Sequence, residues 1–140
     1  MRKINKIIIH CTATPEGRDV SISDVRRWHV EERGWRDIGY HFLIQRDGTI
    51  EEGRPIEQTG AHTRGHNWDS IGIAYVGGMS KDMKEPKDTR TEEQQDALVD
   101  LLCQLHDCYG GKIYGHRDFS SKDCPSFDAK SEYENISYRY

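Results

Sequence analysis

The sequence predicts an α/β fold in which one mixed β-sheet carries helices on both of its faces. Short apolar stretches rich in β-branched residues alternate along the chain with stretches of helical periodicity. Strands separated by helices favour parallel pairing. The turn signal Asp47-Gly48 lies between two of the apolar stretches and predicts a hairpin, which adds an antiparallel pair. The 140 residues suit one domain, so we expect a single unit, 1–140, with its core at about 6–136.

The first half of the chain is predicted to contain one buried strand, one helix and the hairpin. The run KIIIHC is apolar and β-branched, as expected of a strand that is buried on both faces. Ser21 and Asp24 have the spacing of a capping box, which marks the start of a helix. The predicted elements are a strand at 6–11, a helix from Ile22 to about Gly34, and hairpin strands at 40–45 and 49–52.

The second half is predicted to contain two strands and a long helix. Thr91 and Gln94 have the spacing of a second capping box, and leucines follow at helical intervals up to Gly110. The predicted elements are a strand at 70–76, a polar loop at 77–90, a helix from Thr91 to Gly110, a strand at 112–115 and a short helix at 127–135. We expect residues 137–140 to form a frayed tail.

Charge and hydropathy exclude several classes of protein. The net charge of −4 argues against a nucleic-acid-binding protein that works through a basic surface. No run of 18 apolar residues is present, so no membrane span is expected. The amino terminus has only three consecutive apolar residues before His10, which is too few for a signal peptide. We therefore expect synthesis in the cytoplasm without a signal peptide.

The four cysteines are expected to be reduced thiols. Cys103 and Cys108 lie five residues apart on the predicted long helix, where they point to different faces and are too far apart to bridge. Their apolar surroundings favour buried thiols. Cys11 ends the first strand and, by alternation, is expected to face the core.

Three residues with side chains that bind metals follow the ends of predicted strands. His10 and His116 each lie at a strand end, and Cys124 comes eight residues after His116. The carboxyl ends of strands meet at one edge of an α/β sheet, so these three side chains can lie close together. Imidazole and thiolate are donors that zinc prefers, and three ligands with one open position are typical of catalytic zinc. The spacing matches no local metal motif, so ordinary structural roles for these residues stay open at this point.

Several longer segments together resemble one known family. The segments are IIIHCTAT (7–14), RRWHVEERGWRDIGYHFLIQRDGTIEEGR (26–54), GAHTRGHNWDSIGIAYVGG (60–78), YGHRDFS (114–120) and KDCPSFD (122–128). In this order they resemble the type 2 N-acetylmuramoyl-L-alanine amidases, above all the small phage lysozyme-type members. These share a fold with the animal peptidoglycan recognition proteins. The resemblance extends over nearly the whole chain.

The resemblance implies a reaction, a cofactor and a set of site residues. The implied reaction is hydrolysis of the amide between N-acetylmuramic acid and L-alanine in peptidoglycan. One zinc ion would be held by His10, His116 and Cys124. The family's catalytic tyrosine and lysine fall on Tyr40 and Lys122, which would otherwise be a core aromatic and a solvated lysine. Because residues two apart in an extended stretch share a face, Lys122 is expected to point toward the same place as Cys124.

Three further residues are weaker candidates for contact with the substrate. His62 and Asn67 lie in a polar, glycine-containing segment before the strand at 70–76, where a loop can meet glycan or peptide. Arg117 follows a candidate ligand and would pair either with a substrate carboxylate or with a nearby acid such as Asp118. His41 is expected to be structural, and His29 to pack or face solvent, with a place at the rim of the cleft as a further alternative.

Two other functions compete with the amidase. One is a peptidoglycan-binding module without catalysis, which would generally lack the cysteine ligand; Cys124 favours the enzyme. The other is a structural zinc domain, which needs four protein ligands. Peptidoglycan is the expected partner and the chain is expected to be a monomer. It would act on the cell wall after release as a phage or prophage endolysin, with a delivered effector and cytosolic recycling of wall fragments as alternatives.

Overall fold

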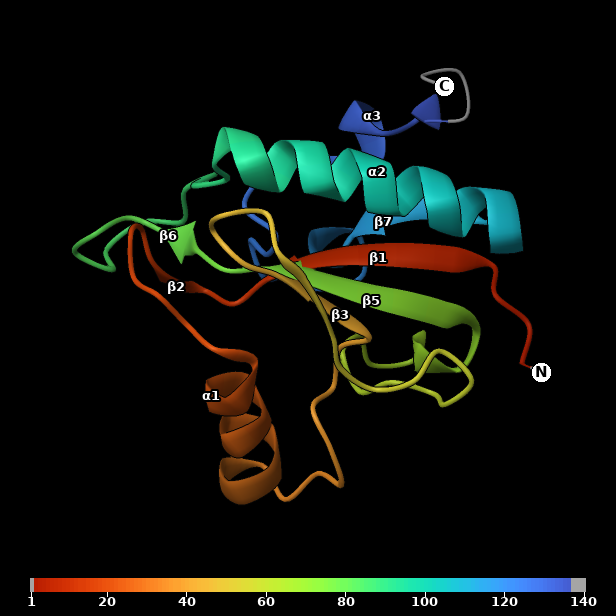
Figure 1. Cartoon of the computed structure of the whole chain (residues 1–140), viewed down its shortest axis with the longest axis horizontal. Helices are drawn as coiled ribbons and strands as arrows, with labels where there is room; N and C mark the ends of the chain where they lie inside the picture. Colours follow the sequence, from red (N-terminus) through yellow and green to blue (C-terminus); the bar gives the residue numbers. More distant parts are fainter. Residues whose placement is uncertain (1, 137–140) are drawn as a thin grey trace.

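A five-stranded sheet in the order β4-β3-β5-β1-β7 forms the centre of the protein (Figure 1). The structure is a computed structural model and describes residues 2–136; the predicted tail at 137–140 lies outside the described residues. Strand β1 pairs in parallel with β5 on one side and with β7 on the other. Strand β3 is parallel to β5, and β4 is antiparallel to β3. The sheet is therefore mixed, as predicted.

The five strands of the central sheet and the three α-helices follow one another in the predicted order. The strands are β1 (Lys6–Cys11), β2 (Thr14–Pro15), β3 (Phe42–Ile44), β4 (Ile50–Glu52), β5 (Ser70–Tyr75), β6 (Gly78–Met79) and β7 (Lys112–Gly115). The helices are α1 (Ile22–Arg27), α2 (Glu92–Tyr109) and α3 (Ala129–Glu132), with a π-helical turn η1 (Trp28–Glu32) and 3-10 turns η2 (Asn67–Asp69) and η3 (His116–Asp118). Both predicted capping boxes are present, at Ser21 and at Thr91.

Several details differ from the expectation. The helix predicted from Ile22 to about Gly34 is α-helical only to Arg27 and continues as the π-helical turn η1, and the strand predicted from Tyr40 begins at Phe42. The last helix, α3, spans four residues rather than the nine predicted from 127 to 135. Strands β2 and β6 pair in parallel as a separate small sheet inside segments predicted to be loops. Two-residue strands are too short to show any periodicity, so the sequence pattern carried no signal for them.

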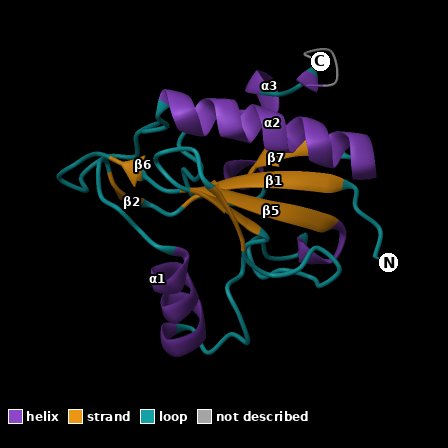
Figure 2. Cartoon of the chain, in the orientation of Figure 1, coloured by secondary structure: helices purple, strands orange, loops and turns teal. Residues whose placement is uncertain are grey.

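Helices cover both faces of the sheet, as Figure 2 shows by their colour. On one face, leucines of α2 and Ala129 of α3 pack against isoleucines of β1 and β5 in a large apolar core. On the other face, Val25 of α1 packs with Leu43 and Ala74 in a smaller core. The apolar periodicity of α2 and α1 explains this arrangement, because each helix buries one stripe against the sheet.

Alternation along β1 separates its side chains between the two faces. Ile7, Ile9 and Cys11 belong to the core beneath α2, so the predicted inward direction of Cys11 is confirmed. His10 lies on the opposite face and is 1% exposed. All four cysteines are thiols rather than disulfide partners, as expected, but Cys108 is exposed rather than buried because α2 turns it away from the core. Among the described residues, no helix is long and apolar enough to cross a membrane.

Candidate metal centre

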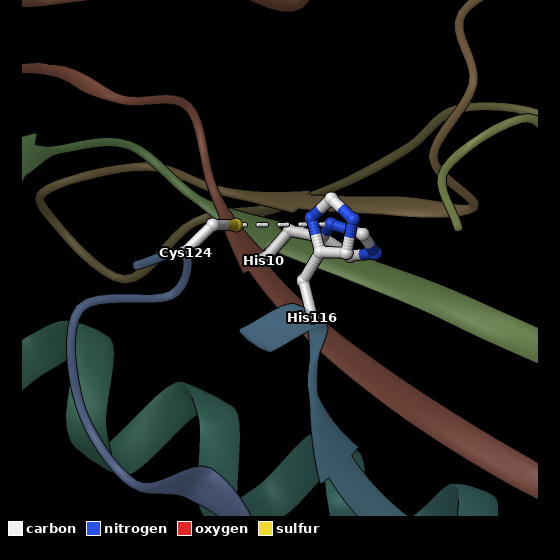
Figure 3. A group of neighbouring side chains, drawn as sticks. All are labelled: His10, His116 and Cys124. Atoms are coloured by element: carbon white, nitrogen blue, oxygen red, sulfur yellow. Dashed lines mark hydrogen bonds between the residues drawn. The ribbon is translucent and has the colours of Figure 1, made fainter. Parts of the chain in front are cut away.

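The side chains of His10, His116 and Cys124 lie together at the carboxyl ends of β1 and β7 (Figure 3). Their candidate ligand atoms all lie within 4.8 Å of one another. Nδ1 of His10 is 3.8 Å from Sγ of Cys124, and the rings of His10 and His116 have their centroids 4.6 Å apart. Parallel pairing of β1 with β7 brings the two strand ends to the same edge, as the sequence analysis assumed.

The segment after η3 carries Cys124 and is anchored at several points. The backbone N–H of Arg117 donates to the carbonyl oxygen of Cys124 at 2.7 Å. The hydroxyl of Tyr75 donates to the carbonyl oxygen of Pro125 at 2.7 Å. The backbone N–H of Cys11 donates to Sγ of Cys124 at 3.2 Å. These bonds fix the thiol beside β1 without help from a long regular element.

Burial and nearby charge set the protonation of the three side chains. Burial lowers the pKa of His10 well below its usual value. Burial and the ammonium of Lys122 lower the pKa of His116, so both rings are neutral at pH 7, as metal ligands must be. The hydrogen bond with the Cys11 thiol and burial raise the pKa of the Cys124 thiol. This thiol therefore needs an adjacent cation to ionise at neutral pH.

Tyr40 lies beside the candidate ligands, and the charge of Lys122 acts on them. The ring centroid of Tyr40 is 5.2 Å from that of His10 and 5.3 Å from that of His29. Burial raises the pKa of the Tyr40 phenol, so this group stays protonated and remains a hydrogen-bond donor. Lys122 is exposed, yet its charge acts on His10, His116 and Cys124. Tyr40 therefore supplies a neutral donor beside the candidate ligands, and Lys122 supplies a positive charge that acts on them.

His29 and His41 support the backbone near the site. Nδ1 of His29 accepts a hydrogen bond from the backbone N–H of Gly39 at 2.8 Å, and its ring lies 4.7 Å from that of Trp35. Nδ1 of His41 accepts from the backbone N–H of Gly72 at 3.0 Å. Both imidazoles are buried, and the packing of His29 agrees with the first of its predicted alternatives.

The three predicted substrate contacts have protein partners of their own. His62 is buried, and its Nδ1 is 2.9 Å from Nε2 of His10. Oδ1 of Asn67 accepts hydrogen bonds from the backbone N–H groups of His62 and Thr63, at 2.9 and 2.8 Å. The guanidinium of Arg117 lies 3.9 Å from the carboxylate of Asp128. For Arg117 the acid partner is therefore Asp128 rather than the Asp118 named as an example.

Two residues that contact His10 or His62 were missed by the sequence reasoning. Oγ1 of Thr63 is 3.2 Å from Nε2 of His10, and Oγ of Ser70 is 3.2 Å from Nε2 of His62. A glycine at position 72, inside an apolar strand, was a usable signal because it marks a close approach of another group. A Cβ at Gly72 would lie 2.5 Å from the ring of His62.

The fold and the site define an α/β protein with two imidazoles and one thiol that can hold a metal ion at one sheet edge. A family model described as N-acetylmuramoyl-L-alanine amidase matches residues 1–127. The endolysin of Klebsiella phage KP32 is 42% identical over 135 residues, which cover 95% of this chain and 87% of the relative. The chain therefore belongs to the N-acetylmuramoyl-L-alanine amidase family, and it is an enzyme of that class, as predicted.

Solved structures support the fold class independently. The N-acetylmuramoyl-L-alanine amidase LysC from Clostridium intestinale URNW superimposes with a TM-score of 0.81 at 29% identity, covering 99% of this chain and 85% of that one. The bumblebee peptidoglycan recognition protein PGRP-SA gives a TM-score of 0.78 at 27% identity, covering 96% and 83%. The predicted fold, with its mixed sheet and helices, is confirmed.

Proposed function

We propose that this chain is a zinc-dependent amidase in which residues 1–140 act as one catalytic domain. Its substrate is the amide bond between N-acetylmuramic acid and L-alanine in peptidoglycan. The observation that carries the proposal is the convergence of His10, His116 and Cys124 beside Tyr40, in a chain of the amidase family. Two nitrogen donors and one sulfur donor form a set that suits zinc better than magnesium or calcium.

The distance between the sulfur and one nitrogen donor is close to that expected around a zinc ion. A tetrahedral zinc with a Zn–S bond of about 2.3 Å and a Zn–N bond of about 2.0–2.1 Å separates sulfur from nitrogen by about 3.6 Å. The separation of Sγ of Cys124 from Nδ1 of His10 is 3.8 Å. Among residues 2–136, the group of candidate ligands consists of these three side chains, without a fourth. Three ligands leave a coordination position for water or substrate, which favours a catalytic ion over a structural one.

The ion would supply a hydroxide nucleophile at neutral pH and polarise the scissile carbonyl. The side chains of Tyr40 and Lys122 would then stabilise the negative charge that develops on the carbonyl oxygen, because preorganised donors act most strongly on the transition state. Lys122 contributes a positive charge from its exposed ammonium. Tyr40 contributes a neutral phenol, and we propose that one of these two groups delivers a proton to the leaving amine.

The biological role follows from the relatives. Among the relatives are proteins named as endolysins of Klebsiella phage KP32 and Escherichia phage T7. We infer that this chain acts in the same way on the bacterial cell wall, as a monomer, after synthesis in the cytoplasm and release or delivery. This role requires neither a nucleic-acid partner nor a membrane span.

A binding module without catalysis is the second candidate, because the relatives also include proteins named for peptidoglycan recognition. The intact ligand set argues for the enzyme. The two functions differ in what they do to the wall: an amidase releases stem peptides, whereas a binding module leaves every covalent bond in place.

The test is muropeptide analysis of purified sacculi after incubation with the full chain. The proposal predicts new L-alanine amino termini, which disappear when a chelator is present and return when zinc is added. A Cys124→Ser variant is the matched control and should leave the sacculi intact. Binding to sacculi without any new amino termini would contradict the proposal and favour the recognition module.

A further inference from the structure

The second ring nitrogen of His10 has protein partners. Because Nδ1 faces Cys124, the nitrogen left over is Nε2, which points toward the segment that carries His62 and Thr63. Nε2 is 2.9 Å from Nδ1 of His62 and 3.2 Å from Oγ1 of Thr63. His10 is 1% exposed, so water has little access to this nitrogen. The hydrogen bonding of Nε2 is therefore decided by this segment.

His62 is itself held in place from several directions. Its ring lies over Gly72 of β5, and a Cβ at that position would be 2.5 Å from the ring. Its Nε2 is 3.2 Å from Oγ of Ser70, which is fully buried. Its backbone N–H donates to Oδ1 of Asn67 at 2.9 Å, and that of Thr63 donates to the same oxygen. The position of the ring is thus fixed by a strand, a loop and a 3-10 turn.

The protons can be assigned along this chain of contacts. A neutral His10 that binds an ion through Nδ1 carries its hydrogen on Nε2 and must donate it. The acceptors in reach are Nδ1 of His62 and Oγ1 of Thr63. If Nδ1 of His62 accepts, a neutral His62 carries its hydrogen on Nε2, where Oγ of Ser70 can accept it. A hydrogen on Nε2 of His10 and another on Nε2 of His62 therefore satisfy all of these contacts at once.

We infer that His62, supported by Thr63 and Ser70, is a positioning residue that fixes His10 in the tautomer whose Nδ1 is free to bind the metal. This role rests on the zinc site of the proposed function and differs from the substrate contact that the sequence analysis predicted for His62. Partners of this kind orient the ring of a ligating histidine and raise its basicity. The inference concerns metal affinity, which is measurable without any substrate.

The experiment compares two substitutions of equal size in the full chain. His62→Asn places an amide oxygen close to the position of Nδ1 and keeps an acceptor, whereas His62→Leu has the same shape without one. Zinc affinity is measured by competition with a chromophoric chelator, with folding checked by circular dichroism. We expect His62→Leu to bind zinc about 10–100-fold more weakly than the unmodified chain. We expect His62→Asn to retain most of the affinity.

A histidine of the same segment provides the control. The ring of His66 stacks on Phe119, with centroids 4.0 Å apart, rather than on His10. His66→Leu should therefore leave the zinc affinity unchanged. Unchanged affinity in a folded His62→Leu variant would overturn the inference, and so would equal losses of wall digestion in His62→Leu and His62→Asn at normal zinc affinity. Failure of the unmodified chain to bind zinc would instead overturn the metal proposal and this inference with it.

A spectroscopic measurement covers the case in which His62→Leu does not fold. Nitrogen-15 NMR of the zinc-loaded, unmodified chain reports which nitrogen of each histidine is protonated. The inference predicts a slowly exchanging hydrogen on Nε2 of His10 and on Nε2 of His62. Coordination of zinc through Nε2 of His10, or a hydrogen on Nδ1 of His62, would contradict it. Thr63→Val, which removes one acceptor with little change of shape, should weaken zinc binding less than His62→Leu.

Discussion

The two faces of the central sheet use the same strands for different purposes. Beneath α2, the side chains of β1 and β5 are apolar, and they pack with the leucines of the helix as a continuous core. On the opposite face, the same strands carry His10, Ser70 and the bare surface of Gly72, over which His62 lies. Alternation along each strand makes this division possible, because neighbouring residues point to opposite sides.

The difference shows that burial alone does not tell a core residue from a candidate metal ligand in this protein. Ile9 and His10 are neighbours in sequence and both are almost fully buried. Burial of Ile9 stabilises the fold because it removes apolar surface from water. His10, in contrast, has two ring nitrogens that each need a hydrogen-bond or metal partner. The face that meets those needs with a thiol, an imidazole and a hydroxyl is the one that can hold an ion. The four predictions below test this division, beginning with the largest expected effect.

Loss of a metal ligand should abolish amidase activity, which we assign to the side of the sheet that carries His10 (the polar face). Cys124→Ser and His10→Ala are expected to bring digestion of sacculi to background, because two remaining ligands hold zinc poorly. Zinc content measured by mass spectrometry should fall in parallel. Cys108→Ser is the control, because that thiol is exposed on α2 and should be neutral in both measurements. Normal turnover in either ligand variant would contradict the account.

Removal of a donor should spare the metal but slow the reaction. Tyr40→Phe and Lys122→Ala are each expected to lower kcat by about 10²–10³-fold, the usual cost of one donor to a developing oxyanion. Zinc content should equal that of the unmodified chain, since neither residue belongs to the group of candidate ligands. Steady-state kinetics on a soluble muropeptide provide the measurement. Full activity in both variants would remove these residues from the mechanism.

A cavity in the apolar core should destabilise the fold without touching the chemistry. Leu102 of α2 is fully buried in the core beneath the helix. Leu102→Ala is expected to lower the free energy of unfolding by about 2–5 kcal/mol. Urea denaturation gives the stability, and activity per folded molecule should be unchanged. A large loss of zinc affinity in this variant would show that the two faces are not independent.

The smallest expected effect is a pH dependence of stability that comes from the polar face. Burial lowers the pKa of His41 to about 4, and the charges of Arg2 and Arg54 act in the same direction. The value in the unfolded chain is about 6.5, so the unfolded state binds more protons between these two values. The contribution of His41 to the free energy of unfolding is fully present above about pH 6.5. It is lost as the pH falls toward 4, by at most about 1.4 kcal/mol per pH unit.

His41→Asn tests this contribution directly. The amide oxygen can still accept from the backbone N–H of Gly72, but the side chain does not titrate. Urea denaturation at pH 7 and pH 5 should show a smaller loss of stability in the variant than in the unmodified chain. Equal losses would mean that other groups account for the pH dependence.

Most of the fold, and the neighbourhood of the site, were predictable because they depend on local patterns. The β-branched run before His10 and the short strand before His116 identified two strand ends, and parallel pairing brought them together. The capping boxes at Ser21 and Thr91 located the helix starts to the residue. The roles of Tyr40 and Lys122 came from the family resemblance and remain proposals.

The partners of His10 were beyond the reach of the sequence, since they depend on contacts between distant segments. Thr63 is 53 residues from His10 along the chain, and an isolated threonine after a histidine has no distinctive spacing. The short strands β2 and β6 were missed for a related reason, because their pairing joins two loops that have no periodicity. Physical proximity, rather than residue type, gives these residues their roles.

The most direct test of the account is the coordination shell of the bound ion. X-ray absorption spectroscopy on the zinc-loaded chain should show one sulfur at about 2.3 Å and three nitrogen or oxygen atoms at about 2.0–2.1 Å. The sulfur should vanish in Cys124→Ser. A shell without sulfur, or one with two sulfurs that included the adjacent Cys11, would contradict a centre built from His10, His116 and Cys124.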